Sequence, residues 1–178
     1  QLQWDIEIPA NTTAEVHLPN KKVQRIGSGK HSFTVQLAQP KGVVVSEFLY
    51  ETAPFPQCHS ATILETASGD LLTAYFGGTR EGHPDVCIYT SRKTKGSKGW
   101  AAPQLVADGV YSETLRKAAY NPVLYQHNNG TIYLYYKVGS RVSDWVGYVK
   151  TSTDEGRTWS AAQQLPDEFL GPIKNKMH

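Results

Sequence analysis

The feature that most constrains the fold of this chain is an internal repeat. When Ser91 is set against Ser152, two long stretches of the sequence align. The pairs matched at this offset are Ile63 with Leu124, Gly69 with Gly130, Leu71 with Ile132, Tyr75 with Tyr136 and Gly78 with Gly139. Trp100 then matches Trp159 if the first copy carries a two-residue insertion. A repeat with a period of about 61 residues indicates an array of similar structural units.

Each copy reads as short β-strands separated by turn signals. The expected strands cover residues 59–66, 70–78 and 86–92 in the first copy and 121–127, 131–139 and 145–153 in the second, each set followed by a fourth segment after a tryptophan. Ser68-Gly69-Asp70 and Asn128-Asn129-Gly130 mark equivalent hairpins. Antiparallel sheets of about four strands at this period predict the blades of a β-propeller. The two blade copies are expected at ~59–107 and ~120–166.

The stretch STDEGRTW at residues 152–159 fits a turn that bonds to itself between the third and fourth strands of a blade. Ser and Asp side chains can accept hydrogen bonds from nearby backbone amides, Gly allows a positive φ, and Trp packs into the sheet. This stretch matches the Asp-box found in sialidases and related propellers. The first copy, SRKTKGSKGW at residues 91–100, lacks the Asp.

Composition excludes several classes of protein. The net charge of +2 is too small to indicate binding to nucleic acid, and no run of about 18 apolar residues indicates a membrane span. The two cysteines, Cys58 and Cys87, do not form a disulfide framework, and no metal-ligand spacing occurs. We therefore expect no metal and no cofactor.

The first forty residues do not share the repeat. Apolar residues alternate with polar ones at Trp4, Ile6 and Ile8, which predicts a half-buried strand, and further strands are expected in the rest of this segment. IPANTTAEVHLP followed by GSGKHSFTV resembles the end of the C-terminal β-sandwich of bacterial α-L-rhamnosidases. The expected domains are residues 1–40 and 41–178, joined near Gln39-Pro40-Lys41-Gly42. The catalytic barrel of that family would lie before residue 1, so none of its catalytic residues can be assigned here.

Residues 43–178 resemble the sialidase-like propellers with BNR repeats, through FPQCHSATILET, GDLLTAYFGGTREGHPDVCIYTSR, YNPVLYQ, STDEGRTW and LGPIKNK. The expected fold is all-β: a partial β-propeller of about two such blades and the start of a third, preceded by strands of a β-sandwich. Because a closed propeller needs at least about four blades, we expect a fragment of a larger protein. Alone it should have no activity, and its bacterial parent is expected to be periplasmic or secreted.

Propeller geometry indicates where a ligand would bind, because the first strand of each blade lines the central axis. The strands begin at His59, at Tyr120 and Asn121, and at Lys174, Asn175 and Lys176. The loop GGTREGHPD adds Arg80, Glu81, His83 and Asp85, and Arg116 and Lys117 precede Tyr120. Cations of this kind would hold the carboxylate of an acidic sugar while an acid or a histidine moves the proton.

The expected catalytic residues are His59, Glu81, His83 and Asp85. The expected substrate-binding residues are Arg80, Arg116, Lys117, Tyr120, Asn121, Lys137, Lys174, Asn175 and Lys176. Each has a structural alternative: the loop and terminal lysines can be solvated, His59 can be packed, and Tyr120 can belong to the core. Lys137, within YYKVG, either extends its ammonium group to solvent or faces the axis.

The resemblance implies a glycoside hydrolase that acts at the non-reducing end of acidic oligosaccharides. Two departures from the sialidase pattern are clear. The Arg of the sialidase Arg-Ile-Pro motif is absent from Cys58-His59-Ser60-Ala61, and the tyrosine nucleophile with its Glu partner would come from later blades. The alternatives are a non-catalytic glycan-binding propeller and a polysaccharide lyase. In each case the expected partner is an acidic oligosaccharide or polysaccharide.

Overall fold

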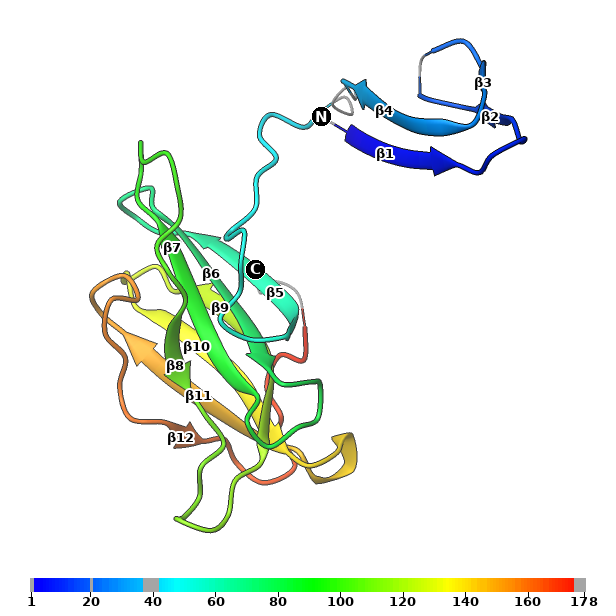
Figure 1. Ribbon diagram of the computed structural model, residues 1–178. Coiled ribbons are helices and arrows are strands. Elements are labelled where there is room, and N and C mark those ends of the chain that lie inside the picture. Colours follow the sequence, from blue (N-terminus) through cyan, green and yellow to red (C-terminus); the bar gives the residue numbers. More distant parts are fainter. Residues whose placement is uncertain (1, 20, 37–41, 175–178) are drawn as a thin grey trace. The chain divides into compact units, whose positions relative to one another are not determined.

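The computed structural model describes residues 2–19, 21–36 and 42–174 (Figure 1). The regular structure in these ranges is β, apart from a 3₁₀ turn at Val142–Asp144. The chain divides into two compact units, Gln1–Glu47 and Phe48–His178. Most of the linker expected at 39–42 lies outside the described residues. No helix in the described part of the chain is long and apolar enough to cross a membrane.

The first unit consists of two antiparallel strand pairs. Strand β1 (Leu2–Ile8) pairs with β4 (Gly29–Val35), and β2 (Ala14–Val16) pairs with β3 (Gln24–Ile26). Their inward side chains meet in a small core of Val16, Leu18 and Val35, with Ile6, Ile26 and Phe33 packed against it. The expected alternation holds for Ile6 and Ile8, which are half-buried, whereas Trp4 is 42% exposed.

The second unit contains two four-stranded antiparallel sheets in which each strand pairs with the next along the chain. Blade one consists of β5 (Gln57–Glu65), β6 (Leu71–Gly78), β7 (Cys87–Lys93) and β8 (Gln104–Ala107). Blade two consists of β9 (Ala118–Gln126), β10 (Ile132–Gly139), β11 (Val146–Ser152) and β12 (Gln163–Gln164). This strand order is the one that propeller blades have.

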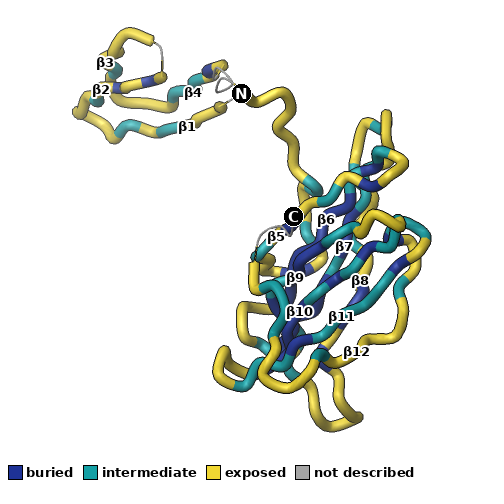
Figure 2. Tube along the Cα trace, turned by 180° about the vertical axis from the view of Figure 1, so that it is seen from behind, coloured by how far each residue is buried: buried dark blue, intermediate teal, exposed yellow. Residues whose placement is uncertain are grey.

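The two blades share one hydrophobic core, which lies mainly along β6, β9 and β10 (Figure 2). Side chains alternate across a strand, so Leu72, Ala74 and Phe76 of β6 lie on one face. They belong to the same buried cluster as Ile132, Leu134, Tyr136 and Val138 of β10. A backbone hydrogen bond of 2.9 Å from Ala119 N to Val86 O also joins the blades. The sheets therefore pack face to face.

The strand registers place the two-residue insertion of the first copy differently from the sequence alignment. In the first two strands the copies correspond as aligned, because Ile63 pairs with Thr73 and its counterpart Leu124 pairs with Leu134. The third strand is shifted. Leu71 pairs with Lys93, whereas its counterpart Ile132 pairs with Ser152. Ser152 therefore corresponds to Lys93 and not to Ser91.

The insertion thus lies in the loop between β6 and β7, not in the turn before Trp100. The turns agree with this placement. Ala101 N donates to Arg92 O over 2.7 Å, and at the equivalent place in blade two Ser160 N donates to Thr151 O over 2.8 Å. Trp100 and Trp159 therefore correspond with no insertion between them and the third strand. The extra residues belong to the loop that carries Arg80, Glu81, His83 and Asp85.

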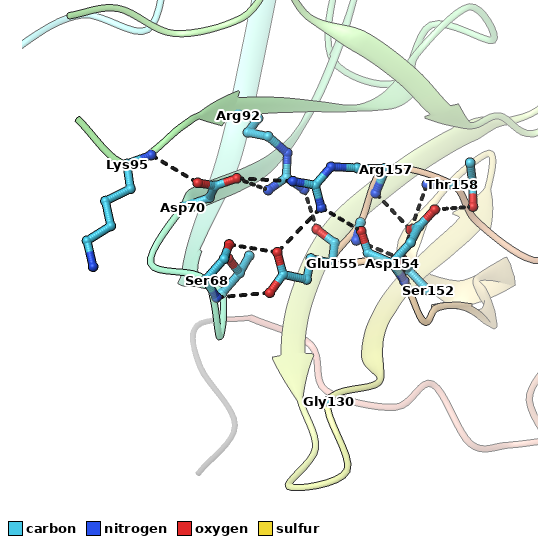
Figure 3. Close-up of polar contacts among 12 residues, drawn as sticks. Ser68, Asp70, Arg92, Lys95, Gly130, Ser152, Asp154, Glu155, Arg157 and Thr158 are labelled. Carbon is cyan, nitrogen blue, oxygen red and sulfur yellow. Dashed lines mark hydrogen bonds and ion pairs between the residues drawn. The ribbon is translucent and has the colours of Figure 1, made fainter. Parts of the chain in front are cut away.

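The turn at 152–159 is organised by Ser152 and Asp154 (Figure 3). Ser152 Oγ accepts hydrogen bonds from the backbone N–H of Asp154 at 3.4 Å and Gly156 at 2.7 Å. Asp154 accepts from the N–H groups of Arg157 at 3.0 Å and Thr158 at 2.9 Å, and from Thr158 Oγ1 at 2.6 Å. These bonds, those from Thr158 foremost, hold the pKa of Asp154 far below its usual range. This confirms the self-bonded turn expected from the sequence.

A polar cluster joins this turn to the other blade (Figure 3). Asp70, which is 3% exposed, lies 3.0 Å from Arg92 and 3.6 Å from Arg157. Arg92 also donates to the backbone carbonyl of Glu155. The Glu155 carboxylate accepts from Ser68 N at 2.9 Å and from Ser68 Oγ at 2.7 Å. The first hairpin of blade one and the Asp-box turn of blade two are therefore bonded together. We call this end of the blades the turn end.

Candidate functional site

The candidate residues between His59 and Lys137 gather at the opposite end of the blades, here called the loop end. It comprises the starts of β5 and β9 and three connecting segments, 79–86, 108–117 and 140–145. Gln57 pairs with Gly78, and Ala118 pairs with Gly139, so the first strand of each blade starts beside the end of the second. This topology brings together side chains that are far apart in the sequence.

Asp85 organises the 79–86 loop. Its carboxylate accepts from the backbone N–H of Thr79 at 3.1 Å and from Thr79 Oγ1 at 2.6 Å, and it lies 2.7 Å from Nδ1 of His83. Burial alone would raise the pKa of Asp85, but the bonds from Thr79 and the neighbouring His83 hold it below its usual value. A carboxylate whose oxygens already accept bonds from Thr79 and lie against His83 is less available to a ligand. Asp85 therefore caps the loop.

Arg80 and Glu81 are exposed members of this loop. The backbone N–H of Glu81 donates to Gln57 Oε1 over 3.2 Å, which ties the loop to the start of β5. Neither side chain forms an ion pair within the described part of the chain. Burial is the main cause of the raised pKa of Tyr120, and the negative charge of Glu81 adds to it. Unlike Asp85, the Glu81 carboxylate forms no hydrogen bond within the described residues.

Tyr120 lies between the two blades and is 5% exposed. Its ring packs edge-on against Phe76 at 5.7 Å and is tilted against Trp145 at 5.0 Å. A Cβ added to Gly82 would lie 3.7 Å from its hydroxyl group, so the 79–86 loop passes over that group. Burial, followed by the charges of Glu81 and Asp144, raises the pKa of Tyr120. The ring belongs to the core, while the hydroxyl has no hydrogen bond within the described residues.

The neighbouring cations Arg116 and Lys117 have different surroundings. Arg116 Nη2 lies 2.8 Å from Cys87 Sγ and 3.5 Å from the carbonyl oxygen of Asp85. Burial raises the pKa of the Cys87 thiol, although the charge of Arg116 opposes this shift. Lys117 Nζ lies 3.8 Å from Asp144 and 5.7 Å from the centre of the Tyr111 ring. Arg116 therefore contacts blade one, and Lys117 contacts the 140–145 loop of blade two.

His59 and Asn121 lie at equivalent backbone irregularities. His59 is exposed and its ring lies 5.6 Å from that of Phe76. The next residue, Ser60, has φ +53°, and its counterpart Asn121 has φ +43°, so each first strand has a register shift near its start. His59 thus remains accessible, but it forms no ion pair with a carboxylate in the described ranges.

Lys137 is fully buried, which rules out the alternative in which it extends to solvent. Its ammonium group donates to the carbonyl oxygen of Asn121 over 3.3 Å and to that of Pro172. Burial lowers the pKa of Lys137 to about 8. Phe76 is its counterpart in blade one. Lys137 therefore links β9 to the segment before Lys174.

Lys174 is exposed at the end of the described chain, and Asn175 and Lys176 lie outside the described residues. Within residues 2–19, 21–36 and 42–174, no three His, Cys, Asp or Glu side chains are placed to hold a metal ion.

Sequence reasoning missed Arg141, Asp144 and Trp145, which belong to the 140–145 loop beside Tyr120. Asp144 accepts from the backbone N–H of Arg141 over 2.8 Å. That bond lowers the pKa of Asp144, against the effect of burial and helped by the charge of Lys117. A signal was present, because Gly139-Ser140-Arg141 matches Gly78-Thr79-Arg80 at the offset of the repeat.

Two protein-family models match the chain. The BNR repeat-like domain matches residues 69–178, and the bacterial alpha-L-rhamnosidase C-terminal domain matches residues 1–33. No curated protein matches it.

Solved structures with the same fold include two sialidases. The Hadza microbial sialidase Hz136 has a TM-score of 0.53 at 18% identity, over 60% of this chain and 25% of its own. The NanB sialidase from Streptococcus pneumoniae has a TM-score of 0.52 at 11% identity, over 86% of this chain and 44% of its own.

A protein of unknown function from Dyadobacter fermentans DSM 18053 has a TM-score of 0.50 at 20% identity, over 71% of this chain and 40% of its own. The chain therefore spans less than half the length of each of these structures, and at these identities the likeness establishes the fold alone. Together with the face-to-face blades and the Asp-box turn, the family match over residues 69–178 shows that the chain belongs to the BNR repeat-like domain family, with a sialidase-like partial propeller.

Proposed function

We propose that the full protein containing this chain is a glycoside hydrolase that removes an acidic sugar from the non-reducing end of an oligosaccharide. The observation that supports this most directly is the position of the 79–86 loop. Gly82 of this loop passes over the hydroxyl group of Tyr120, which has no hydrogen bond within the described residues, and its neighbour Glu81 is tied through its backbone N–H to Gln57 at the start of β5. Titratable side chains without partners, lying beside positively charged side chains, mark a candidate reactive site.

In this proposal each residue of the loop end has a separate role. Glu81 donates the proton to the leaving oxygen, because Asp85 is already engaged by Thr79 and His83. Arg80 and Lys117 neutralise the carboxylate of the substrate, and Tyr120 contacts the sugar ring through its hydroxyl group. His59 lies exposed at the start of β5, where it can bond to a ligand hydroxyl. Asp85 and Lys137 position the loop and the strand.

A non-catalytic glycan-binding propeller is the second candidate. It is favoured by the engagement of both loop aspartates, since Asp85 and Asp144 are bonded to backbone N–H groups of their own loops. Such a site would bind an acidic glycan through the same cations but would lack a strong proton donor.

A product assay on the full protein tests the proposal. Sialyl, uronyl and rhamnosyl oligosaccharides would be incubated with the protein, and products would be identified by mass spectrometry and by absorbance of unsaturated sugars. We expect release of an acidic monosaccharide, a strong loss in Glu81→Gln, and little change in Glu113→Gln, an exposed acid of the 108–117 segment.

Two results would contradict the proposed reaction, and a third would change the assignment of its proton donor. Binding without any product would identify a binding propeller. An unsaturated product would identify a lyase. Full activity in Glu81→Gln, with activity lost in Asp85→Asn, His83→Ala or His59→Ala, would move the proton donor to that residue.

A further inference from the structure

The two loops at the loop end are built in the same way. Gly78-Thr79-Arg80 opens the first loop, and Gly139-Ser140-Arg141 opens the second at the equivalent place in the repeat. An aspartate closes each loop, and the pairing of the third strands makes Asp85 the counterpart of Asp144. The first loop is the longer one, because it carries the insertion. This repeat is separate from the Asp-box repeat at the turn end.

The aspartates make comparable bonds. Asp85 Oδ1 accepts from the backbone N–H of Thr79 over 3.1 Å, and Asp144 Oδ1 accepts from that of Arg141 over 2.8 Å. The glycines are equivalent as well. A Cβ at Gly78 would lie 2.7 Å from Asp85 Oδ1, and a Cβ at Gly139 would lie 2.7 Å from Asp144 Oδ1. Glycine thus lets the carboxylate approach the backbone in both loops.

The consequence is that each blade presents one arginine from a capped loop. Arg80 and Arg141 are both exposed, and neither guanidinium group has a carboxylate within 4.0 Å in the ranges that the structure describes. The aspartate that could have paired with each arginine is bonded to the loop backbone instead. An exposed guanidinium group without a carboxylate partner keeps its five donors free for a carboxylate or sulfate.

We propose that Arg80 and Arg141 are successive anion-binding positions for an extended acidic polysaccharide that crosses from one blade to the next. The inference deepens the proposed function and rests on it for the choice of a glycan. Packed sheets lie about 10 Å apart, so the two arginines would contact acidic groups on non-adjacent sugars of one chain. A dense phosphate chain fits less well, since Glu81, Asp108 and Glu113 carry negative charge at the same end.

The test measures binding by this chain itself, without any need for turnover. Polygalacturonate is the acidic probe and dextran is the neutral one, and affinities are measured by isothermal titration calorimetry at low and high salt. The variants are Arg80→Gln, Arg141→Gln and the double variant. Lys98→Gln is the matched control, because it removes one exposed positive charge at the turn end.

We expect binding to polygalacturonate that weakens as salt rises, and no binding to dextran. Each arginine substitution should weaken binding about twofold to fivefold, the range for an exposed ion pair, and the double variant should lose the product of both factors. Lys98→Gln should match the unchanged chain. Circular dichroism should be the same for all variants, since neither guanidinium group pairs with a carboxylate in the described ranges.

The inference is overturned if the unchanged chain does not bind polygalacturonate, or if the double variant binds it as well as Lys98→Gln does. Equally tight binding to single-stranded DNA would also overturn it, because it would indicate a general polyanion surface. The proposed hydrolysis fails by a different result, the absence of product from the full protein, so the two failures can be told apart.

Discussion

The carboxylate of Asp70 accepts a 2.9 Å hydrogen bond from the backbone N–H of Lys95, in the turn of blade one that lacks an Asp-box aspartate. In blade two the corresponding N–H belongs to Asp154 and donates to Ser152 Oγ. In blade one the acceptor for this N–H is therefore Asp70, which lies in the first hairpin. In blade two the acceptor is Ser152, which lies within the turn itself. The same carboxylate pairs with Arg92 and Arg157, so one side chain supports both turns.

Replacing Asp70 should destabilise the second unit. In Asp70→Asn the charge that faces Arg92 and Arg157 is lost, and we expect the midpoint of urea unfolding to fall clearly. Glu65→Gln is the control, because Glu65 is an exposed acid at the end of β5. Equal midpoints for the two variants would show that the cluster of Asp70 and its arginines contributes nothing to stability.

The Asp-box turn should make stability depend on acid pH. The pKa of Asp154 is lowered in the fold from an ordinary value of 3.8, mainly by bonds from Thr158. A lowered pKa contributes stability that is present above the unfolded value and is lost as pH falls below about 4. Asp154→Asn should therefore be less stable at pH 7, and its unfolding free energy should approach that of the unchanged chain near pH 2. Parallel curves measured by denaturant titration between pH 5 and pH 2 would contradict this.

Lys137 should make stability rise with pH in the alkaline range, because its charged form is the one that the fold disfavours. Its pKa in the fold is about 8, below the ordinary 10.5, because burial disfavours the ammonium form. Between these values the folded state binds fewer protons than the unfolded state, so stability rises with pH from about 8 to about 10.5. Lys137→Met should remove this rise.

The readout for Lys137 is the difference in unfolding free energy between Lys137→Met and the unchanged chain, followed across this pH range. Using a difference cancels the other groups that titrate there, among them Lys150 and Cys87. Lys98→Met is the control and should follow the unchanged chain. A constant difference would show that the ammonium group is not desolvated.

Tyr120→Phe should separate the packing of the Tyr120 ring from the contact of its hydroxyl group with a ligand. The ring stays between Phe76 and Trp145, and the hydroxyl has no partner in the described residues, so stability should change by less than about 1 kcal/mol. Tyr120→Ala should cost about 3–5 kcal/mol, as other aromatic truncations in cores do.

If the hydroxyl of Tyr120 contacts the sugar, Tyr120→Phe should weaken glycan binding about fivefold to tenfold, the loss expected for one hydrogen bond. Tyr125→Phe, in the same strand, should leave binding unchanged. Calorimetry with the acidic probe measures both, and unchanged binding in Tyr120→Phe would leave Tyr120 as a core residue only.

Gly78→Ala should disturb the 79–86 loop without unfolding the blade. The new Cβ would lie 2.7 Å from Asp85 Oδ1 and 2.9 Å from Val86 Cα, so the capping carboxylate must move. We expect a loss of about 1–3 kcal/mol and faster hydrogen exchange at the Thr79 amide. Gly99→Ala is the matched control, because no atom lies within 4 Å of a Cβ there. Unchanged exchange at Thr79 would show that the cap is not held by this close approach.

Much of the fold could be predicted because its determinants are local. Gly69 and Gly130, in the two hairpins, both have positive φ, as their turn sequences indicate. The turn signals and apolar runs predict the strands of both blades, and the Asp-box predicts its own bonds. These features depend on neighbours within a few residues, which a sequence displays directly.

The register could not be predicted in this way, because it depends on pairing between strands. Ser91 and Ser152 are the same residue type but do not occupy equivalent positions in the two blades. Ser91 Oγ lies 2.9 Å from the Tyr75 hydroxyl, whereas Ser152 Oγ accepts backbone hydrogen bonds in a turn. The same shift concealed the match between Asp85 and Asp144. Lys137 bonds to backbone carbonyl groups, which every residue type has. The sequence therefore could not predict that this lysine is buried.

The insertion in the 79–86 loop leaves the later strand pairings of blade one in place, because the Asp85 cap closes the longer loop as Asp144 closes the shorter one. Recognition and folding thus depend on different parts of the chain. Over evolutionary time, descendants of such a repeat could acquire new specificities by lengthening one loop per blade or by changing its charges, while the turn end, bonded across the blades, stays under separate selection.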